Sequence, residues 1–506
     1  MIAVVQSGTV FAFTAHQIDV EVDIARGMRV FSVVGLPASA VTESRTRVKS
    51  ALVNAGYAFP KGRVTVNLAP AHIRKDGTAF DLPIALGILC AQKCIKQAAL
   101  ARTLVVGELG LDGHLRPTQG ILPLALAAKR LNCERLLAPT VNALEASPVP
   151  GLECIGVDHL AQAVEYLAGL TSIEAASPPP NVTEDDHDVD MSEVKGQHQA
   201  RRALEIAAAG GHNLLFVGPP GTGKTMLARR LPTIVPSMSL RESLETSAIN
   251  SVAGTLPSDG SLITIRPFRA PHHTVSHIAL VGGGSIPRPG EVSLAHNGIL
   301  YLDELPEFKR VALEALRQPL EDGNVLVSRA LMTATYPARF SLIASMNPCP
   351  CGYSGHPTRE CRCPVQAVER YQDRISGPLL DRFDMHMKLK PTPICHMLEG
   401  PDGEPSSTIR ARVSAAWDRQ RQRQGMKEGE CRNGHLSPRA LRAHCQLDTA
   451  SQVVLTRAIE KYGLSGRAHH RTLMVARTIA DLDGATNLQV DHVSEALLYR
   501  APAGSP

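Results

Sequence analysis

The sequence is poor in aromatic side chains and in long apolar runs. Its 506 residues include ten phenylalanines, eight tyrosines and one tryptophan, Trp417. So few rings argue against a protein built mainly on aromatic surfaces that stack nucleic-acid bases. No stretch approaches the ~18 consecutive apolar residues that a membrane-spanning helix requires, so we expect no membrane partner.

The N-terminal residues carry no lysine or arginine, and the cysteines do not form the pattern of a disulfide framework. The first lysine or arginine is Arg26, whereas a secretory signal peptide begins with a charged segment. The 11 cysteines are spread over a long chain, unlike those of a small disulfide-rich secreted domain. Both features predict a cytoplasmic protein whose thiols are mostly reduced.

The chain also lacks a strong excess of one charge. Its formal net charge of +5 is weak evidence for any partner, and a basic segment, Arg410–Arg432, suits a solvated helix face as well as it suits nucleic-acid contact. The content of 44% hydrophobic and 20% charged residues is typical of a soluble globular protein. At ~150 residues per domain, the length predicts about three domains.

A segment rich in proline and acidic residues divides the chain. The letters AASPPPNVTEDDHDVDM occupy Ala175–Met191 and cannot build a core, so we predict a linker over residues 175–192. The preceding block, residues 1–174, alternates strand-like and helix-like runs and predicts an α+β or α/β domain. Its strands are expected at Val20–Val22 and Val64–Leu68, and its helices at Glu43–Asn54 and Leu122–Leu131.

The block after the linker begins with an α/β pattern and ends with helices. A helix is expected at Ala200–Ala209, then an apolar strand at Leu214–Val217, a glycine-rich turn and a second helix from Lys224. We predict an α/β core over residues 193–392 and a helical domain over 393–506. The helices of the last domain are expected at Thr408–Gln424, Thr449–Tyr462, Ala468–Leu482 and Val490–Tyr499.

The glycine-rich turn matches the phosphate-binding pattern G-x-x-x-x-G-K-[ST]. Its glycines let backbone N–H groups wrap around phosphates, while the lysine supplies charge at the β- and γ-phosphates and the last hydroxyl binds Mg²⁺. The strand before the turn and the helix after it are the context that this pattern requires. The predicted ATP-binding residues are Gly218, Pro219, Pro220, Gly221, Thr222, Gly223, Lys224 and Thr225.

Paired carboxylates follow a second apolar strand about 80 residues further on. The segment NGILYLDE ends in Asp303 and Glu304. In a protein with a phosphate-binding loop, one acid at such a strand tip helps to hold Mg²⁺ and the other polarises the water that attacks the γ-phosphate. Asp303 fits the first role and Glu304 the second.

Two more polar residues are candidates for the same chemistry. A third apolar strand, Phe340–Ser345, leads to Asn347, which could orient the attacking water. Arg382 lies in the segment LLDRFD and could act as an arginine finger, which a neighbouring subunit usually supplies. An arginine at this position alone is more often part of a surface ion pair.

A cysteine cluster and a histidine cluster remain. Cys349, Cys351, Cys361 and Cys363 form C-x-C-x9-C-x-C in a loop rich in glycine and proline. Four thiolates suit a structural Zn²⁺, although the C-x-C spacing is tight, and the alternative is a loop that only carries thiols. His272, His273 and His277 have no acidic or thiol partner close in sequence, so we interpret them as part of a loop that contacts a neighbour or substrate.

Several segments together resemble the magnesium-chelatase-like AAA+ family, and within it the YifB/ComM branch. They are GPPGTGKT, GILYLDE, ASMNPCPCG, RISGPLLDRFD and RAHHRTLMVARTIADL, with FSVVGLP, VNLAPA and DLPIALGIL in the first block. The resemblance covers almost the whole chain. It implies an α/β P-loop AAA+ core with a helical lid, ATP bound with Mg²⁺ between subunits, and a homo-hexameric ring whose pore accommodates DNA.

The resemblance also implies residue roles. Asn347 is similar to sensor 1, Arg382 to the finger that acts in trans, and Arg467 to sensor 2, with Arg471 as a competitor. Arg374 is a second candidate for the subunit interface. The alternating pattern over residues 324–340 predicts a β-hairpin of the kind that points into the pore in this superfamily, and Arg329 is its candidate DNA contact.

The first block resembles the Lon-protease fold without its catalytic pair. The segment KDGTA aligns Ala79 with the position of the serine nucleophile, and the stretch Gly113–Leu124 places Leu124 at that of the partner lysine. Without a hydroxyl and an amine, the Ser–Lys mechanism has neither attacker nor base. We therefore expect an α+β Lon-like domain that is catalytically inactive.

Three functions fit these features. The first is an ATP-driven helicase that acts on branched or single-stranded DNA without sequence preference and drives branch migration. It would serve recombination during natural transformation, with recombination proteins as partners. The second is a protein-remodelling ATPase like the magnesium-chelatase motor subunit, which generally lacks the first block. The third is a nucleotide-gated binding module, against which Asp303, Glu304 and Asn347 argue because they serve hydrolysis.

Overall fold

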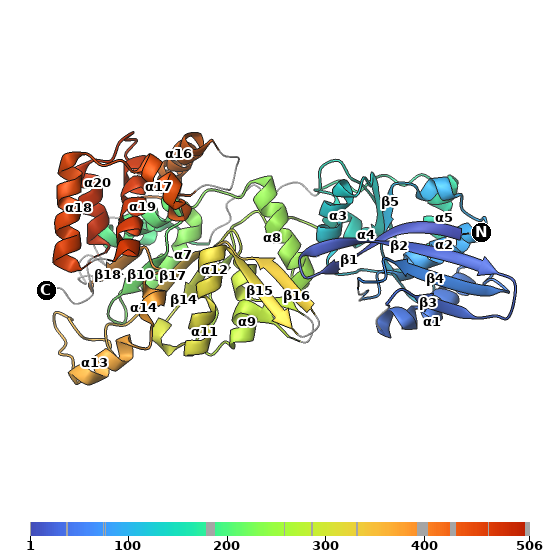
Figure 1. Cartoon of the computed structure of the whole chain (residues 1–506), viewed down its shortest axis with the longest axis horizontal. Coiled ribbons are helices and arrows are strands. Elements are labelled where there is room, and N and C mark those ends of the chain that lie inside the picture. The colour runs from blue at the N-terminus through green and yellow to red at the C-terminus, as the bar shows by residue number, and fades with distance from the viewer. Residues whose placement is uncertain are drawn as a thin grey trace. The chain divides into compact units, whose positions relative to one another are not determined.

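The computed structural model describes residues 2–36, 39–73, 75, 77–178, 188–257, 259–284, 287–329, 332–391, 403–425, 432–463 and 465–500. They form two compact units (Figure 1). The N-terminal unit comprises Met1–Val182, Ser243–Ile263 and Ala330–Ala334. The P-loop unit comprises Thr183–Glu242, Thr264–Arg329 and Thr335–Pro506. Residues 179–187 of the predicted linker lie outside the described residues.

A seven-stranded mixed sheet forms the centre of the N-terminal unit. The strand order is β3-β4-β2-β1-β5-β8-β9, and β1, β2 and β4 pair antiparallel while the other neighbours are parallel. Both predicted strands are confirmed inside β2 and β4. The bounds are β1 Ile2–Phe11, β2 Thr14–Ala25, β3 Phe31–Val34, β4 Arg63–Ala69, β5 Thr103–Val105, β8 Arg135–Pro139 and β9 Glu153–Val157.

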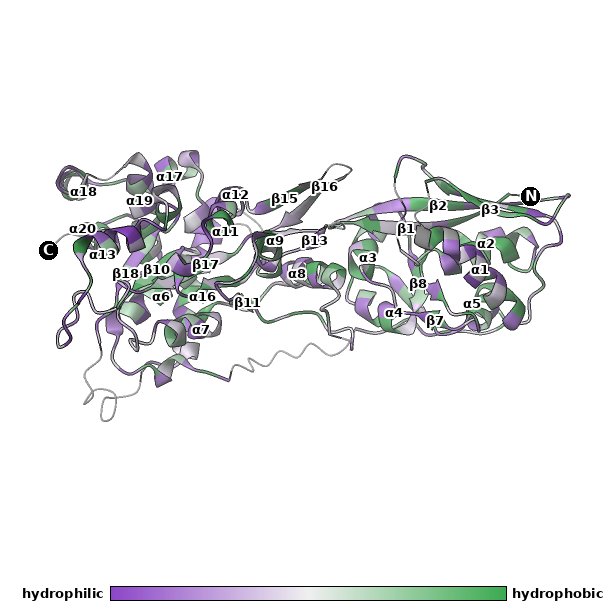
Figure 2. Ribbon diagram, turned by 90° about the horizontal axis from the view of Figure 1, so that it is seen from below, coloured by the Kyte–Doolittle hydropathy of each residue, from purple (hydrophilic) through white to green (hydrophobic). Residues whose placement is uncertain are grey.

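Helices pack on this sheet and bury its apolar side chains. The helix α2, Asp81–Ala91, is buried along nearly its whole length, because its residues are apolar on every side (Figure 2). The other helices are α1 Ser39–Asn54, α3 Ile121–Arg130, α4 Thr140–Ala146 and α5 Leu160–Ala168, and a small hairpin consists of β6 Glu108–Leu109 and β7 Leu115–Arg116. The helices predicted at Glu43–Asn54 and Leu122–Leu131 agree with α1 and α3 to within a few residues.

Part of a helix far along the chain completes the N-terminal unit. The helix α8 spans Leu240–Ala253, and from Ser243 onward it belongs to this unit. Leu244 and Ala248 join the core cluster that contains α3 side chains, and the Ser251 hydroxyl donates to the buried Glu145 carboxylate. Nothing in the local sequence pattern had indicated this membership.

The P-loop unit is built on a five-stranded parallel sheet with the order β11-β14-β17-β10-β18. The three central strands, β14, β17 and β10, are mainly apolar because helices cover both faces, and every residue of β17 is buried. This mixed α/β arrangement with a parallel sheet is consistent with a P-loop AAA+ core. The bounds are β10 Leu214–Val217, β11 Phe268–Arg269, β14 Ile299–Leu302, β17 Ser341–Met346 and β18 Met385–Lys388.

Helices and small hairpins surround this sheet (Figure 1). The helix α6, His198–Gly210, and the helix α7, Lys224–Ile234, flank β10 in sequence as predicted. The hairpin expected over residues 324–340 is confirmed as β15 Asn324–Arg329 and β16 Met332–Pro337. The remaining elements are β12 Gly282–Gly283, β13 Arg288–Pro289, α9 His277–Val281, α10 Glu291–Leu294, α11 Arg310–Ala315, α12 Arg317–Asp322, α13 Val365–Gln372 and α14 Gly377–Leu380.

The C-terminal helices share one hydrophobic core with this sheet. Val413 and Ile479 lie in the same buried cluster as Leu214 and Phe216 of β10. The helices expected here from apolar spacing are confirmed at α16 Ser406–Gln424, α18 Thr449–Tyr462, α19 Gly466–Leu482 and α20 Val490–Leu498, with α17 Pro438–His444 between the first two. No described helix is long and apolar enough to cross a bilayer.

Candidate nucleotide-binding site

The phosphate-binding loop joins the end of β10 to the start of α7. Gly221 and Gly223 have φ values of +78° and +83°, a region that favours glycine. A Cβ on Gly218 would lie 2.9 Å from the carbonyl oxygen of Leu389, so a side chain does not fit there. The loop therefore turns its backbone toward the N-terminus of α7, where free N–H groups and the helix dipole favour an anion.

Lys224 connects this loop to the tip of β17. Its ammonium donates to the carbonyl oxygens of Gly218 at 2.7 Å and Pro219 at 2.9 Å, and to Oδ1 of Asn347 at 3.1 Å. Burial lowers the pKa of Lys224, against the attraction of Asp303 and Glu304. The structure thus brings the predicted lysine and the predicted sensor asparagine into direct contact.

Asp303 receives hydrogen bonds from two hydroxyls. Thr225 Oγ1 donates to Oδ2 at 2.8 Å, and the Ser345 hydroxyl donates to Oδ1. Burial alone would raise the pKa of Asp303, but these hydrogen bonds hold it below its ordinary value. The result is an ionised carboxylate beside a threonine hydroxyl, which is an oxygen donor set suited to Mg²⁺. Sequence reasoning missed Ser345, although it lies on β17, the strand that leads to Asn347.

Glu304 lies next to Asp303 with a different environment. Its φ of +51° is in the left-handed region, and its backbone N–H donates to Oδ1 of Asp303 at 3.0 Å. The side chain is 55% exposed and its Oε2 lies 3.6 Å from Nδ1 of His273. An exposed carboxylate at the edge of the site can accept a proton from water, as the predicted role requires.

His273 is therefore a further residue of this site. Its ring lies 4.0 Å from that of His272, measured between centroids, and both follow β11, the sheet neighbour of β14. The sequence alone predicts that these histidines belong to a loop that contacts a neighbour or substrate. The signal that could have placed His273 is its position after a strand adjacent to the one that ends at the paired acids.

The two arginine-finger candidates differ in exposure. Arg382 is 6% exposed, and its guanidinium pairs with Glu321 of α12. Burial lowers its pKa, with a smaller effect from the like charges of Arg467, Arg471 and Arg317. Arg374 is 54% exposed and pairs with Glu307 at 2.9 Å. Among the contacts of the described residues, neither guanidinium binds the phosphate-binding loop of its own chain.

The two sensor 2 candidates also differ. Arg471 forms an ion pair with the buried Asp384 and donates to the carbonyl oxygen of Arg382 at 3.1 Å. Arg467 lies in the first turn of α19, where it is exposed and forms no ion pair with another described residue. Arg471 therefore has a structural partner, while Arg467 is left with a guanidinium that a ligand can approach.

Several described arginines of the basic segment bind their own chain. Arg410 donates to the carbonyl oxygen of Thr233, Arg412 pairs with Glu205, and Arg423 pairs with Asp481. The Arg432 guanidinium lies 4.4 Å from the ring centroid of Trp417, the single tryptophan. These arginines tie α16 to the rest of the P-loop unit.

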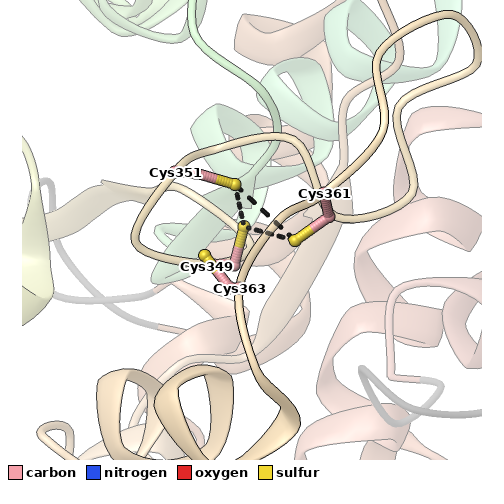
Figure 3. Close-up of side chains that lie close together, drawn as sticks. All are labelled: Cys349, Cys351, Cys361 and Cys363. Atoms are coloured by element: carbon pink, nitrogen blue, oxygen red, sulfur yellow. Dashed lines mark hydrogen bonds between the residues drawn. The ribbon is translucent and has the colours of Figure 1, made fainter.

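The four clustered cysteines converge in one loop (Figure 3). Their sulfur atoms all lie within 4.8 Å of one another, and three pairs are 3.4–3.6 Å apart. Four sulfur ligands at ~2.3 Å from a tetrahedral Zn²⁺ would be ~3.8 Å apart. The donor set therefore fits zinc.

The candidate DNA contact and the segments compared with the Lon catalytic pair are described to different extents. Arg329 ends β15, but its side chain lies outside the described residues, as does Asp76 of the KDGTA segment. Leu124 is buried in α3 and packs so closely on Gly8 that a Cβ there would lie 2.5 Å from its Cδ2. Nearby in sequence to Ala79, Lys75 is fully buried and donates to the carbonyl oxygen of Pro70.

Comparison with known proteins adds family relationships. The sequence matches the family of magnesium chelatase, subunit ChlI, over residues 190–397, and further parts of that subunit over residues 20–142 and 403–500. Competence protein ComM of Haemophilus influenzae is 43% identical over 506 residues, which cover 99% of this chain and 97% of that protein. YifB of Escherichia coli is 43% identical over 504 residues, again 99% and 97%. The magnesium-chelatase 38 kDa subunit of Rhodobacter capsulatus is 27% identical over 31% of this chain and 50% of its own length.

Proposed function

Since the chain belongs to the YifB/ComM family of magnesium-chelatase-like AAA+ proteins, we propose that it is a Mg²⁺-dependent ATPase that drives branch migration of DNA. One observation carries the ATPase proposal: the sheet edge brings together two hydrogen-bonded pairs, Lys224 with Asn347 and Thr225 with Asp303. The DNA part rests on the match along nearly the whole chain to a protein named for competence.

Each residue of the group has a place in ATP hydrolysis. Lys224 binds the β- and γ-phosphates, while Thr225 and Asp303 hold Mg²⁺, which neutralises the charge that develops on the phosphates. Glu304 polarises the attacking water, with His273 against its carboxylate, and Asn347, which accepts from the Lys224 ammonium, helps to orient that water. Arg467 reaches the nucleotide from α19, since it has the freer guanidinium of the two candidates.

In the proposed ring, the adjacent subunit supplies the arginine that stabilises the γ-phosphate. In a homo-hexamer Arg382 acts in trans on the γ-phosphate of the adjacent subunit, which requires its guanidinium to exchange Glu321 for phosphate. Arg374, exposed and paired only at the surface with Glu307, is the second candidate for that contact. Loss of the arginine contact to the adjacent subunit would stop ATP hydrolysis while nucleotide binding continues.

DNA would contact the ring through its pore hairpin. The β15–β16 hairpin is the feature that supports this, and Arg329 is the residue that we assign to phosphate contact. Contacts to phosphates alone give binding that is independent of sequence and weakens with salt. The arginines of α16 have a minor role here, because the guanidinium groups of Arg410, Arg412 and Arg423 bind the chain itself.

The parts outside the nucleotide site have structural roles in this proposal. We assign residues 1–174 to a Lon-like domain without protease activity, residues 193–392 to the ATPase core and residues 393–506 to the lid. Ala79 and Leu124 at the two catalytic positions support the first assignment. Zn²⁺ held by Cys349, Cys351, Cys361 and Cys363 would be structural, because four protein ligands leave no open position.

A four-way DNA junction provides the test. Purified wild-type protein, Glu304→Gln and the control Glu460→Gln are mixed with a synthetic junction, ATP and Mg²⁺. Glu460 is an exposed glutamate of α18, outside the site. We expect resolution into duplexes by wild type and by Glu460→Gln, and none by Glu304→Gln. If wild type hydrolyses ATP but leaves the junction intact, the DNA proposal is wrong.

The second candidate is a protein-remodelling ATPase, like a magnesium-chelatase subunit. The match to the Rhodobacter capsulatus subunit favours it, but that match covers 31% of this chain. A remodelling enzyme would hydrolyse ATP without resolving the junction, so the same assay distinguishes the two functions.

A further inference from the structure

The cysteine loop, residues 349–363, begins two residues after Asn347. Cys349 is fully buried, while Cys351, Cys361 and Cys363 are half-buried. Between Met346, where β17 ends, and Val365, where α13 begins, the described chain forms no helix or strand. Regular hydrogen bonding therefore does not fix this segment, and its four sulfur atoms are the groups that converge within it (Figure 3).

The loop packs directly on the phosphate-binding loop. Gly352 has a φ of +82°, and a Cβ placed on it would lie 2.7 Å from Cδ and 2.8 Å from Cγ of Pro220. The same Cβ would lie 3.9 Å from Cγ of Asn347. Gly352 is held in this position by a turn in which its N–H donates to the carbonyl oxygen of Cys349 at 2.9 Å. The backbone between two cysteines thus forms a wall against Pro220.

The far end of the cysteine loop returns to the same place. After Cys363 the chain enters α13, where Gln372 donates from Nε2 to the carbonyl oxygen of Pro348 at 3.2 Å. Tyr371 is buried and takes a backbone hydrogen bond from Asn347. Asn347 in turn accepts from the Lys224 ammonium. The segment that carries Asn347 is therefore held from the loop on one side and from α13 on the other.

We propose that a zinc ion bound by the four cysteines fixes the cysteine loop against Pro220 and Asn347, and that zinc occupancy sets the affinity of the nucleotide site. This inference rests on the proposed ATPase site and adds a metal control to it. Zinc takes the place of secondary structure in this loop. The free energy of binding four thiolates offsets the conformational entropy that the loop loses when it becomes ordered. Without the ion, the wall at Gly352 is no longer fixed, and nucleotide must order both loops when it binds.

Zinc content and nucleotide affinity are measured on the full chain with a fluorescent ATP analogue in excess Mg²⁺. The variants are Cys361→Ser/Cys363→Ser, Gly352→Ala and the control Cys94→Ser, which replaces an exposed cysteine outside the loop. We expect one zinc per chain in wild type and in Cys94→Ser, with equal affinities. The double serine variant should lose zinc and bind the analogue about tenfold more weakly. Gly352→Ala should keep zinc and still lose affinity.

A second measurement, on wild type, tests the inference even if the serine variant misfolds. Zinc is removed from wild type with a zinc-selective chelator and restored, and Co²⁺ is added instead to detect the absorption bands of a tetrahedral thiolate site. Affinity should fall and recover with the metal. Wild type without zinc or cobalt binding overturns the inference, and so does unchanged affinity in the zinc-free protein.

The proposed function fails in a different way. If wild type does not bind the analogue, or if Lys224→Ala binds it as well as wild type does, then the nucleotide site itself is wrong and the inference falls with it. If Lys224→Ala abolishes binding while the zinc-free protein binds normally, only the metal control is wrong.

Discussion

Asp384 joins the sheet of the P-loop unit to its C-terminal helices. The residue is 3% exposed and directly precedes β18. Its Oδ2 accepts the N–H of Asn213 at 2.9 Å and lies 3.5 Å from Nδ1 of His212, while Oδ1 pairs with Arg471 of α19. Burial would raise the pKa of Asp384, but these partners hold it well below its ordinary value. The ionised carboxylate is therefore the form that the fold stabilises.

Replacement of Asp384 by asparagine should be strongly destabilising. The change keeps the side-chain size but leaves the Arg471 guanidinium without its counter-charge, and breaking a buried ion pair from one side costs about 3–5 kcal/mol of unfolding free energy. For a domain of this size that lowers the melting temperature by about 10 °C. Because the folded pKa is depressed, the wild-type contribution is complete above the ordinary pKa of 3.8 and is lost only as the pH falls below it. The difference should thus persist unchanged from pH 8 to about pH 5.

Thermal unfolding of the full chain measures this loss. The set is wild type, Asp384→Asn, Arg471→Met and the double variant, with Asp381→Asn as a control three residues away. The double variant should be much less destabilised than the sum of the single variants, because the second substitution removes the unpaired charge. Strictly additive losses, or an Asp384→Asn melting temperature equal to that of Asp381→Asn, would show that the pair does not hold the helices to the sheet.

Three further predictions concern the nucleotide site. Lys224→Ala and Arg382→Ala should both reduce ATP turnover, by about 10³-fold or more for Arg382, but only Lys224→Ala should strongly weaken nucleotide binding; an equal loss of binding in a titration would contradict the roles. His273→Ala should lower kcat about tenfold with little change in KM, since it removes the neighbour of the Glu304 carboxylate; an unchanged steady-state kcat would exclude a positioning role. Arg467→Ala should weaken nucleotide affinity while leaving the melting temperature within about 1 °C of wild type, because the Arg467 side chain is exposed. A large fall in the melting temperature would show that Arg467 is structural.

Local patterns predicted the elements that carry the site. The apolar strands ending before Gly218, Asp303 and Asn347 were predictable because each is a short run buried on both faces of a parallel sheet. Their side chains then meet, since the carboxyl ends of parallel strands lie along one edge. The hairpin over residues 324–340 followed from its alternation in the same way.

Contacts between distant segments could not be predicted. The sequence shows Arg382 and Arg423 only as cations, and their ion pairs with Glu321 and Asp481 depend on how helices pack. His273 gave no motif, because its role comes from the order of strands in the sheet. These features are set by tertiary structure, which neither spacing nor composition encodes locally.

The membership of Ser243–Ile263 in the N-terminal unit has a consequence for synthesis on the ribosome. When residue 182 leaves the exit tunnel, the surface that later receives Leu244 and Ala248 is still uncovered. At ~5–20 residues per second, the missing piece follows roughly 4–16 s later, after the whole phosphate-binding loop has been made. During that interval the nascent chain presents an apolar face, and a chaperone that binds it has a defined window in which to act. The first unit to be translated is thus completed only by a segment encoded within the second.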